Sequence, residues 1–548
     1  MIGYPERRMG PIELESAGWL AVLLLALSLW GPAVGAVSAQ SYDLIIRNGR
    51  VLDGTGNPWF HADVAVSGDR IVAVGRLGNA TAARIIDARG MYVAPGFIDV
   101  HSHAASGLVR RELSGARPIL AQGVTTVFVN PDGGGAVDLL RQRAALEEHG
   151  LGVNVAQLVA HGSIRQAVLG MDDRAPSPEE LKRMRALVQA GMEAGAFGMS
   201  SGPYYAPGSY ASTEELIELA RVVADYDGIY TSHIRDEADF NIGVVAATDE
   251  VIRIAREARL PGIVTHIKVL GPRVWGYSAA LVSRIERARE EGVEVFADQY
   301  PYAASGTGLV GALVPPWAQA GGDTALSRRM DDRAERARLR AGIVDNLDRR
   351  GGAERIQFRR HAADPSVEGR TLHDIALERS MHPADLAMEL LRAGPASIVS
   401  FNMHEADVGR LMRQPWTMTS SDGELVPMGE GVPHPRSYGT FPRKLRVYVQ
   451  ERGVIGLEQA IHSMTHLPAT VHRLRDRGIV REGAVADLVV FDLARVNDPA
   501  NFREPHQLSE GMVHVLVNGQ AAIDAGVLTD ALHGRVLSRR ATQNMNNP

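Results

Sequence analysis

The sequence of 548 residues contains no cysteine. This absence excludes disulfide bonds, thiolate nucleophiles, iron–sulfur clusters and zinc sites with cysteine ligands. Any bound metal must take its ligands mainly from the 18 histidines and the carboxylates. An excess of positive charge is also missing, because the formal net charge is −6, and this argues against a general nucleic-acid-binding function. The remaining composition is that of a globular protein and excludes collagen, coiled coil and wholesale disorder.

An uncharged apolar run covers residues 19–36, and Gly31 and Pro32 break it before a stretch of small residues. This pattern predicts a signal peptide over residues 1–39 and therefore export to the periplasm or the cell exterior. The run is marginal in length for a membrane span. We therefore expect no stable membrane insertion after cleavage, and an uncleaved N-terminal anchor is the less favoured alternative.

Short strand patterns occur at both ends of the remaining chain, separated by turn clusters rich in glycine, asparagine and proline. Two separated β-rich ends can pair with each other. The sequence therefore predicts one small β-sandwich that is built from residues 40–95 and 476–548. The expected strands lie at 42–46, 62–66, 70–74, 486–491 and 513–520.

Between these ends, short apolar runs alternate with amphipathic helical segments. Strand–helix alternation favours a parallel sheet with crossover helices, and about eight strand candidates predict an α/β fold with a (β/α)8 TIM barrel. The barrel is expected over residues 96–475. The stretch at about 303–415 does not keep the period, and its Arg- and Asp-rich middle predicts a helical insertion late in the barrel. The expected strands lie at 93–100, 124–129, 153–160, 197–200, 229–232, 263–265, 293–297 and 416–419.

Four histidines lie at the ends of predicted barrel strands, where the active sites of such barrels are built. His101 and His103 are spaced i and i+2, so on a strand both imidazoles point to the same side and can reach one cation. His233 and His266 end two further runs in the same phase. Each histidine taken alone would more often be structural, but together they predict a metal site.

Asp422 ends the last strand candidate. In a structural interpretation this aspartate caps a turn before Gly423. In a functional interpretation its carboxylate lies beside the metal and takes a proton from a bound water. The second interpretation gains weight from the histidines at the other strand ends.

The chain contains the motifs DGTGNPWFHADV, APGFIDVHSH, QGVTTV, SHIRDE, THIKVLG, DQYPY, PWTMTSSDG and HPRSYGTFPR. Together they resemble the amidohydrolase superfamily, and specifically its N-acyl-D-amino-acid deacylases (D-aminoacylases). The resemblance covers nearly all of the chain beyond the predicted signal peptide. It implies a barrel with a β-sandwich made from both termini, zinc binding, and hydrolysis of N-acyl-D-amino acids to a carboxylate and a free amino acid.

The family also implies a cysteine ligand after the second barrel strand, in a motif similar to TTVVVGNCG. The corresponding stretch here is TTVFVNPDG, and an ungapped comparison places Asp132 at the cysteine position. The other residues that the resemblance implies are the metal ligands His101, His103, His233 and His266 and the general base Asp422.

An aspartate oxygen can ligate or bridge divalent cations, and it is a harder ligand than thiolate. We therefore expect one or two ions, most readily zinc, with a weaker preference for zinc over manganese or cobalt. In the alternative, Asp132 belongs only to a polar Asn-Pro-Asp-Gly turn and the site keeps its histidine ligands alone.

An N-acyl amino acid is an anion, so its carboxylate needs a fixed cationic partner. Lys268 lies two residues after His266, and a strand would direct it to the same mouth. Tyr205 can donate to the scissile carbonyl oxygen or to the carboxylate, and Tyr204 is equally placed by spacing alone. The substrate-binding candidates, of which Lys268 and Arg436 match family positions, are Lys268, Arg436, Tyr205, Tyr302 and Ser305.

Further polar residues follow the same strand ends. Arg235, Asp236 and Glu237 are expected to order the loop after His233 and not to take part in catalysis. His161 ends another strand run, and we expect it behind the metal ligands and not among them.

Two alternatives to deacylation of N-acyl amino acids stay open. One is another amide or cyclic-amide hydrolase of the same superfamily, such as a dipeptidase or a hydantoinase- or dihydroorotase-like enzyme. Lys268 with Arg436 favours an acyclic substrate that has a free carboxylate. The other is a non-catalytic binding protein that kept the barrel. In every case the expected partner is a small molecule and not a nucleic acid, and a homo-oligomer is compatible with the sequence.

Overall fold

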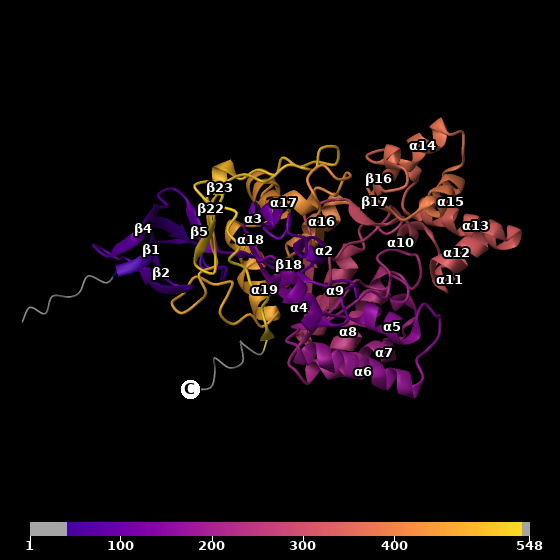
Figure 1. Cartoon of the computed structure of the whole chain (residues 1–548), viewed down its shortest axis with the longest axis horizontal. Coiled ribbons are helices and arrows are strands. Elements are labelled where there is room, and N and C mark those ends of the chain that lie inside the picture. Colours follow the sequence, from indigo (N-terminus) through magenta and orange to yellow (C-terminus); the bar gives the residue numbers. More distant parts are fainter. Residues whose placement is uncertain (1–40, 540–548) are drawn as a thin grey trace, which may run out of the picture.

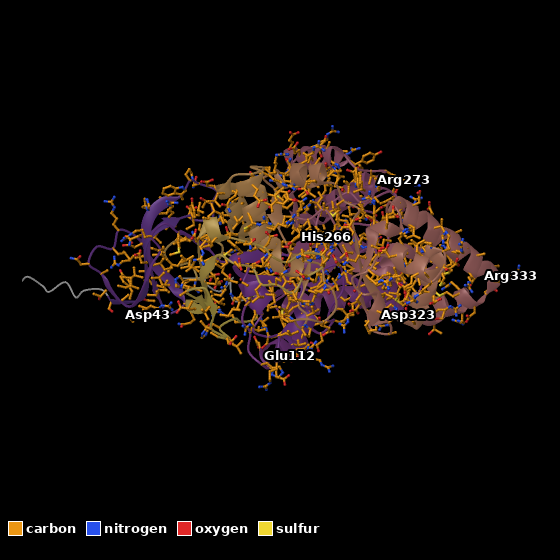
Figure 2. All side chains as sticks on the ribbon, turned by 90° about the horizontal axis from the view of Figure 1, so that it is seen from above. Asp43, Glu112, His266, Arg273, Asp323 and Arg333 are labelled. Carbon is orange, nitrogen blue, oxygen red and sulfur yellow. The ribbon has the colours of Figure 1, made fainter. Side chains whose placement is uncertain are left out.

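The computed structural model describes residues 41–539, so the predicted signal peptide and the expectation of export lie outside the described residues. Within residues 41–539, no helix has both the length and the apolar character that a membrane crossing requires. A sheet lies at one end of the molecule, the barrel at its centre and the segment of residues 303–400 at the other end (Figure 1). Figure 2 shows the same order in a second direction, with Asp43 and Arg333 at opposite ends and His266 between them.

Parallel pairing connects the predicted barrel strands in sequence order. The barrel closes where β7 (Ser102–His103) pairs in parallel with β19 (Gly423–Glu424). This confirms the (β/α)8 fold class that the sequence predicts. The strands are β6 (Phe97–Asp99), β8 (Val124–Val129), β9 (Asn154–Gln157) continued by β10 (Val159–Ala160), β11 (Gly198–Ser201), β12 (Ile229–Ser232), β13 (Gly262–Val264), β14 (Val295–Gln299) and β18 (Thr417–Thr419).

Amphipathic helices separate most of these strands, as predicted. Ser177 and Glu180 form a capping box that starts α6 (Pro178–Glu193). Met184 and Val188, four residues apart, lie on the buried face of this helix. The other predicted helices are present as α7 (Thr213–Ala224), α8 (Val244–Ala258) and α9 (Ser278–Glu290).

Strands from the two ends of the chain pair in one sheet of nine strands within the described residues. The joining contact is antiparallel pairing of β5 (Tyr92–Pro95) with β20 (Leu488–Phe491). The run expected at 93–100 is divided at Gly96: β5 joins the terminal sheet, and β6 joins the barrel. A Cβ atom at Gly96 would lie 2.2 Å from Thr125 Oγ1. The other strands are β1 (Ser41–Val51), β2 (Phe60–Ser67), β3 (Arg70–Gly75), β4 (Thr81–Asp87), β21 (Met512–Val517), β22 (Gln520–Asp524) and β23 (Val527–Leu528).

The segment predicted as a helical insertion also contains an antiparallel sheet, which the sequence analysis missed. The sheet has the order β15 (Ser305–Gly308), β17 (Ala396–Ser400) and β16 (Ile356–His361). Short runs such as these give a weaker pattern than the adjoining helices. The helices pack on the sheet around a separate core, and they are α10 (Leu309–Leu313), α11 (Pro316–Gln319), α12 (Gly322–Asp331), α13 (Arg333–Arg349), α14 (Leu372–Glu378) and α15 (Pro383–Ala393).

The insertion ends before the expected limit at residue 415. The next helix, α16 (Glu405–Met412), places Leu411 and Met412 in the main core of the barrel. Residues 303–400 are called the insertion domain.

A buried charged group connects the start of α5 (His161–Leu169) with α7. The Glu215 carboxylate accepts from His161 Nε2 at 3.0 Å and from Arg165 Nη1, and all three side chains are buried. His161 thus binds a helix and not a residue of the predicted metal site. The Glu215 charge compensates a guanidinium that has no access to water.

We expect Glu215→Gln to destabilise the protein by about 3–5 kcal/mol, because removal of one partner leaves the Arg165 charge buried and uncompensated. Urea unfolding followed by circular dichroism measures this change. Glu257→Gln is the matched control, since the Glu257 carboxylate pairs with Arg253 at 2.7 Å on the exposed face of a helix. The control should leave the urea midpoint nearly unchanged, and equal shifts in the two variants would contradict the prediction.

Candidate active site

The predicted metal ligands converge because each follows the carboxyl end of a barrel strand, and these ends meet at one mouth. His101 follows β6, His103 lies in β7, Asp132 follows β8, His233 follows β12, His266 follows β13 and Asp422 follows β18.

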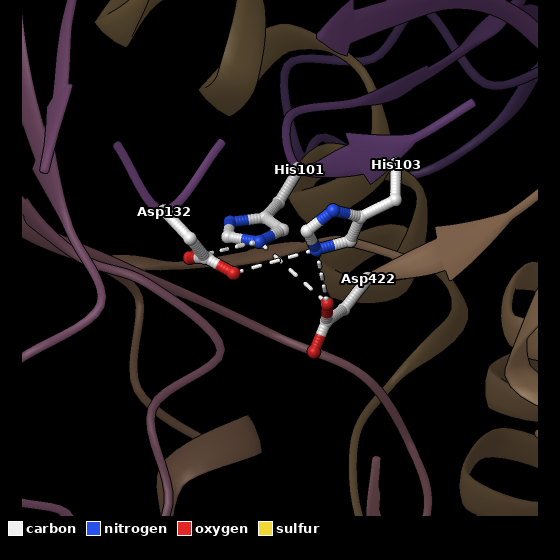
Figure 3. A group of neighbouring side chains, drawn as sticks. All are labelled: His101, His103, Asp132 and Asp422. Carbon is white, nitrogen blue, oxygen red and sulfur yellow. Dashed lines mark ion pairs between the residues drawn. The ribbon is translucent and has the colours of Figure 1, made fainter. Parts of the chain in front are cut away.

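The first group of side chains is His101, His103, Asp132 and Asp422, whose potential ligand atoms all lie within 4.8 Å of one another (Figure 3). Asp132 Oδ1 lies 3.3 Å from His101 Nε2, and Asp132 Oδ2 lies 3.3 Å from His103 Nε2. Asp422 Oδ1 lies 3.1 Å from His103 Nε2 and 3.6 Å from His101 Nε2. Two imidazoles and two carboxylates therefore face a common point.

The second group is Asp132, His233 and His266, which meets the same distance limit. Asp132 Oδ1 lies 3.4 Å from His266 Nε2 and 3.7 Å from His233 Nδ1. Asp132 is thus shared by both groups and lies between the two pairs of histidines. A carboxylate in this position has the geometry of a bridging ligand.

The turn that presents Asp132 has an unusual backbone. Asp132 has a φ of 56°, in the left-handed region that aspartate and asparagine enter more easily than most residues. Gly133 follows with a φ of 71°, and a Cβ atom there would lie 3.0 Å from the backbone nitrogens of Gly162 and Gly202. The turn is therefore closely packed against the start of α5, which follows β10, and against the loop after β11.

Several atoms of these groups are buried without a hydrogen-bond partner among the described residues. Those that face the common space are His101 Nε2, Asp132 Oδ1 and His233 Nδ1. Buried polar atoms without partners are costly, and such clusters call for a group that satisfies them together. Nitrogen and carboxylate oxygen ligands at this spacing suit a divalent cation, so the residues present fit a metal centre.

Both carboxyls of the first group are ionised by their surroundings. Burial alone would raise the pKa of Asp132, but His101, His103 and His233 outweigh burial and hold this pKa well below its usual range. Burial likewise opposes ionisation of Asp422, yet the Arg436 guanidinium and the histidines hold the pKa of Asp422 below its usual range. Each carboxylate is thus available as a ligand or a proton acceptor.

Glu237 belongs to the site, which the sequence analysis did not expect. Glu237 Oε1 lies 2.6 Å from Lys268 Nζ and 3.2 Å from His266 Nδ1, and Oε2 lies 3.4 Å from His233 Nε2. Glu237 thus contacts both histidines on ring atoms other than those that face Asp132. A carboxylate behind a ligand histidine fixes the ring and raises its basicity. Residues 233–237 form a loop and not a helix, so the spacing of Glu237 from His233 gave no signal in the sequence.

The rest of that loop behaves as expected. Asp236 is buried, and its carboxylate accepts hydrogen bonds from the backbone N–H groups of Ala238, Phe240, Asn241 and Gly243. Arg235 pairs with Glu250 of α8 at 2.8 Å. These two residues order the loop, and only Glu237 reaches the metal ligands.

A cavity of about 460 Å³ opens over the predicted metal ligands. The substrate candidates Lys268, Arg436, Tyr205 and Ser305 line it. Arg436 Nη1 lies 2.6 Å from Asp422 Oδ2. In this structure both cations predicted to hold the substrate carboxylate thus face carboxylates of the protein, since Lys268 faces Glu237.

Tyr302 is the one substrate candidate that the structure places elsewhere. Its hydroxyl donates to Pro435 O at 3.4 Å and its ring packs on Phe502, so it is not among the described residues that line the cavity. Instead, the ring of Tyr300 lies 5.6 Å from Lys268 Nζ and 4.8 Å from Arg436 Cζ. The sequence does not predict this position for Tyr300, because the chain leaves strand geometry after β14, where spacing no longer indicates direction.

The insertion domain supplies one wall of the cavity. Thr307, Arg350 and Arg359 belong to it and line the cavity together with barrel residues. Tyr205 lies where the two parts meet, because its hydroxyl is 3.0 Å from Thr307 Oγ1 and its ring centroid is 4.6 Å from that of His233. The cavity is therefore complete only when the insertion domain is packed against the barrel.

Comparison with known proteins agrees with this site. The sequence profile of the amidohydrolase family matches residues 84–523. D-aminoacylase from Alcaligenes xylosoxydans xylosoxydans is 36% identical over 526 residues, which cover 92% of this chain and 99% of that protein. The structure of N-acyl-D-glutamate deacylase from Bordetella bronchiseptica with zinc and a phosphonate inhibitor is 36% identical, with a TM-score of 0.77 over 91% of this chain and 100% of that one.

A solved structure of D-aminoacylase, a protein with a binuclear metal centre, is 34% identical to this chain. Its TM-score is 0.78, and the match covers 91% of this chain and 100% of that one. The two structural matches extend over the barrel, the insertion domain and the terminal sheet. The chain therefore belongs to the amidohydrolase family, in its D-aminoacylase branch.

Proposed function

We propose that the protein hydrolyses the amide bond of N-acyl-D-amino acids and releases a carboxylate and a free D-amino acid. One observation carries this proposal: a cavity unites two metal-ligand groups, the carboxylate of Asp422, and the cations Lys268 and Arg436. The preference for the D configuration rests on the similarity to D-aminoacylase and to the N-acyl-D-glutamate deacylase.

A bound divalent cation supplies Lewis-acid chemistry, which acidifies a water molecule and polarises the scissile carbonyl. Asp422 is the general base: it accepts the water proton on a carboxylate oxygen and returns it to the leaving amine. Arg436, 2.6 Å from Asp422 Oδ2, keeps this carboxylate ionised and oriented. Tyr205 borders the metal ligands and can donate to the negative charge that develops on the carbonyl oxygen.

Lys268 and Arg436 bind the substrate carboxylate in this proposal. Both are at most 4% exposed, so a charge-assisted bond to the substrate forms away from water. Glu237 and Asp422 hold the two cations in place before the substrate carboxylate binds to them. A free carboxylate is a feature of N-acyl amino acids, so this pair of cations favours them over cyclic amides.

Hydrolysis of a substrate panel tests the proposed function. The panel contains N-acetyl-D-amino acids, N-acetyl-L-amino acids and hydantoins, which separate the alternatives. Release of free amino acid and metal content are measured on the same sample. We expect turnover of the N-acetyl-D compounds. Turnover confined to hydantoins would overturn the proposal, and no turnover at all after addition of Zn, Mn or Co would favour the binding protein.

We further propose that His101, His103, His233 and His266 ligate the metal and that Asp132 takes the place of the thiolate ligand of the family. Its carboxylate contacts histidines of both groups, and its Oδ1 is buried without a hydrogen-bond partner. Carboxylate is a harder ligand than thiolate, so zinc should bind with a smaller advantage over manganese and cobalt.

Asp132→Asn tests the ligand role, because asparagine tolerates the left-handed φ of 56° but has no negative charge. We expect the variant to bind less metal and to lose activity in parallel, as measured by elemental analysis and kinetics. Asp138→Asn is the matched control, since Asp138 caps α4 (Leu139–Glu147) outside the cavity. Full metal content in Asp132→Asn would refute the assignment, while Asp132→Cys should shift metal preference toward zinc.

Asp422→Asn should keep the metal but slow catalysis by roughly 10²–10⁴, the range expected for loss of a general base. Asparagine also tolerates the φ of 49° at this position, so the fold should survive. Turnover number and metal content on one preparation distinguish the two effects. An unchanged turnover number would remove Asp422 from the proton transfer.

A further inference from the structure

The four cationic side chains that line the cavity differ in one respect. Three of them face a carboxylate of the protein, and the fourth, Arg350, does not. The three pairs are Lys268 with Glu237 at 2.6 Å, Arg436 with Asp422 at 2.6 Å, and Arg359 with Glu424.

Arg350 lies at the end of α13 in the insertion domain and is 1% exposed. Its guanidinium donates to Ala312 O at 3.0 Å, to Tyr204 Oη at 2.9 Å and to Ser400 Oγ at 3.3 Å. All of these acceptors are neutral. Among the ion pairs of residues 41–539, none includes Arg350.

The acidic residues on the neighbouring loop are engaged elsewhere. Asp236 accepts from four backbone N–H groups, and Glu237 contacts Lys268 and the ligand histidines. The face of Phe240, 5.1 Å from Arg350 Cζ, gives only a weak cation–π contact. The positive charge of Arg350 is therefore uncompensated by any direct contact with a carboxylate.

A buried charge without an opposite partner is costly, and proteins seldom retain one unless it binds something. Because Arg350 lines the cavity, an anionic group of a ligand can supply the missing partner. Guanidinium is well suited to this, since it binds carboxylates through two parallel N–H···O bonds.

The position of Arg350 differs from that of the pair expected to hold the α-carboxylate. Arg350 binds Tyr204, whose ring centroid lies 5.0 Å from that of His233. Arg436 instead binds Asp422. The two arginines thus have different neighbours in one cavity, so a substrate with two carboxylates has a separate cation for each.

We propose that the cavity selects dianionic N-acyl amino acids, with Arg350 as the residue that binds the second carboxylate. This inference rests on the proposed deacylase function. The second carboxylate comes either from an acidic amino-acid side chain or from a dicarboxylic acyl group, and the chemistry of recognition is the same for both.

Kinetics of the metal-loaded full-length protein test this proposal. The monoanion is N-acetyl-D-leucine, and the dianions are N-acetyl-D-glutamate, N-acetyl-D-aspartate and N-succinyl-D-leucine. We expect kcat/KM for at least one dianion to exceed that for the monoanion by about tenfold or more, the scale of one charge-assisted hydrogen bond. The N-acetyl and N-succinyl compounds distinguish the two sources of the second carboxylate.

Arg350→Met removes the charge at similar length and should lower the dianion-to-monoanion ratio of kcat/KM by about tenfold or more. Arg350→Lys, which keeps the charge, should retain part of the preference. Arg349→Met is the matched control, because Arg349 pairs with Asp345 and Asp239 and does not line the cavity; it should leave the ratio unchanged.

Two outcomes would overturn the proposal. In the first, the wild-type protein has a kcat/KM for the monoanion that equals or exceeds its kcat/KM for every dianion. This result does not depend on the folding of any variant. Alternatively, Arg350→Met would lower kcat/KM equally for all compounds, which indicates a structural role. Absence of turnover for all four compounds would instead count against the proposed function itself.

Discussion

The position of the Asp132 carboxylate is the constraint on which the rest of the site depends. One oxygen faces His101 and His266, and the other faces His103. No other carboxylate among the described residues joins both potential ligand groups. The glycine that follows packs against the start of α5 and the loop after β11, so this part of the barrel mouth is built around the turn. Aspartate enters left-handed backbone at lower cost than most residues, so Asp132 suits the φ of 56° that this turn requires.

The barrel and the insertion domain contribute different chemistry. Strand ends of the barrel provide the predicted metal ligands and Asp422, whose positions follow from strand geometry and closure of the barrel. The insertion domain adds Thr307, Arg350 and Arg359, which face these groups across the cavity. In the proposed function, hydrolysis thus depends on residues of the barrel, whereas substrate selection depends on residues of a separate domain.

The sequence was sufficient for the barrel and for the convergence of the predicted ligands, because strand ends impose position and periodicity imposes direction. It was insufficient where the backbone leaves regular geometry. Tyr302 was predicted in the cavity, but Tyr300 faces the cations. Glu237 lies in a loop whose path no sequence pattern determines. Arg350 lies in a domain whose packing on the barrel depends on tertiary contacts. These residues required the structure because their contacts are long-range.

Charge balance connects the metal centre with substrate choice. The side chains that line the cavity include four carboxylates and four cations, so their formal charges cancel. Histidines that ligate a metal are neutral, and each bound divalent cation therefore leaves the cavity positive. A positive cavity walled by protein raises the local concentration of anionic substrates and disfavours neutral ones. An aspartate in place of a thiolate leaves this charge balance unchanged, since each carries a single negative charge, but the two oxygens of Asp132 face different histidines and can contact two ions.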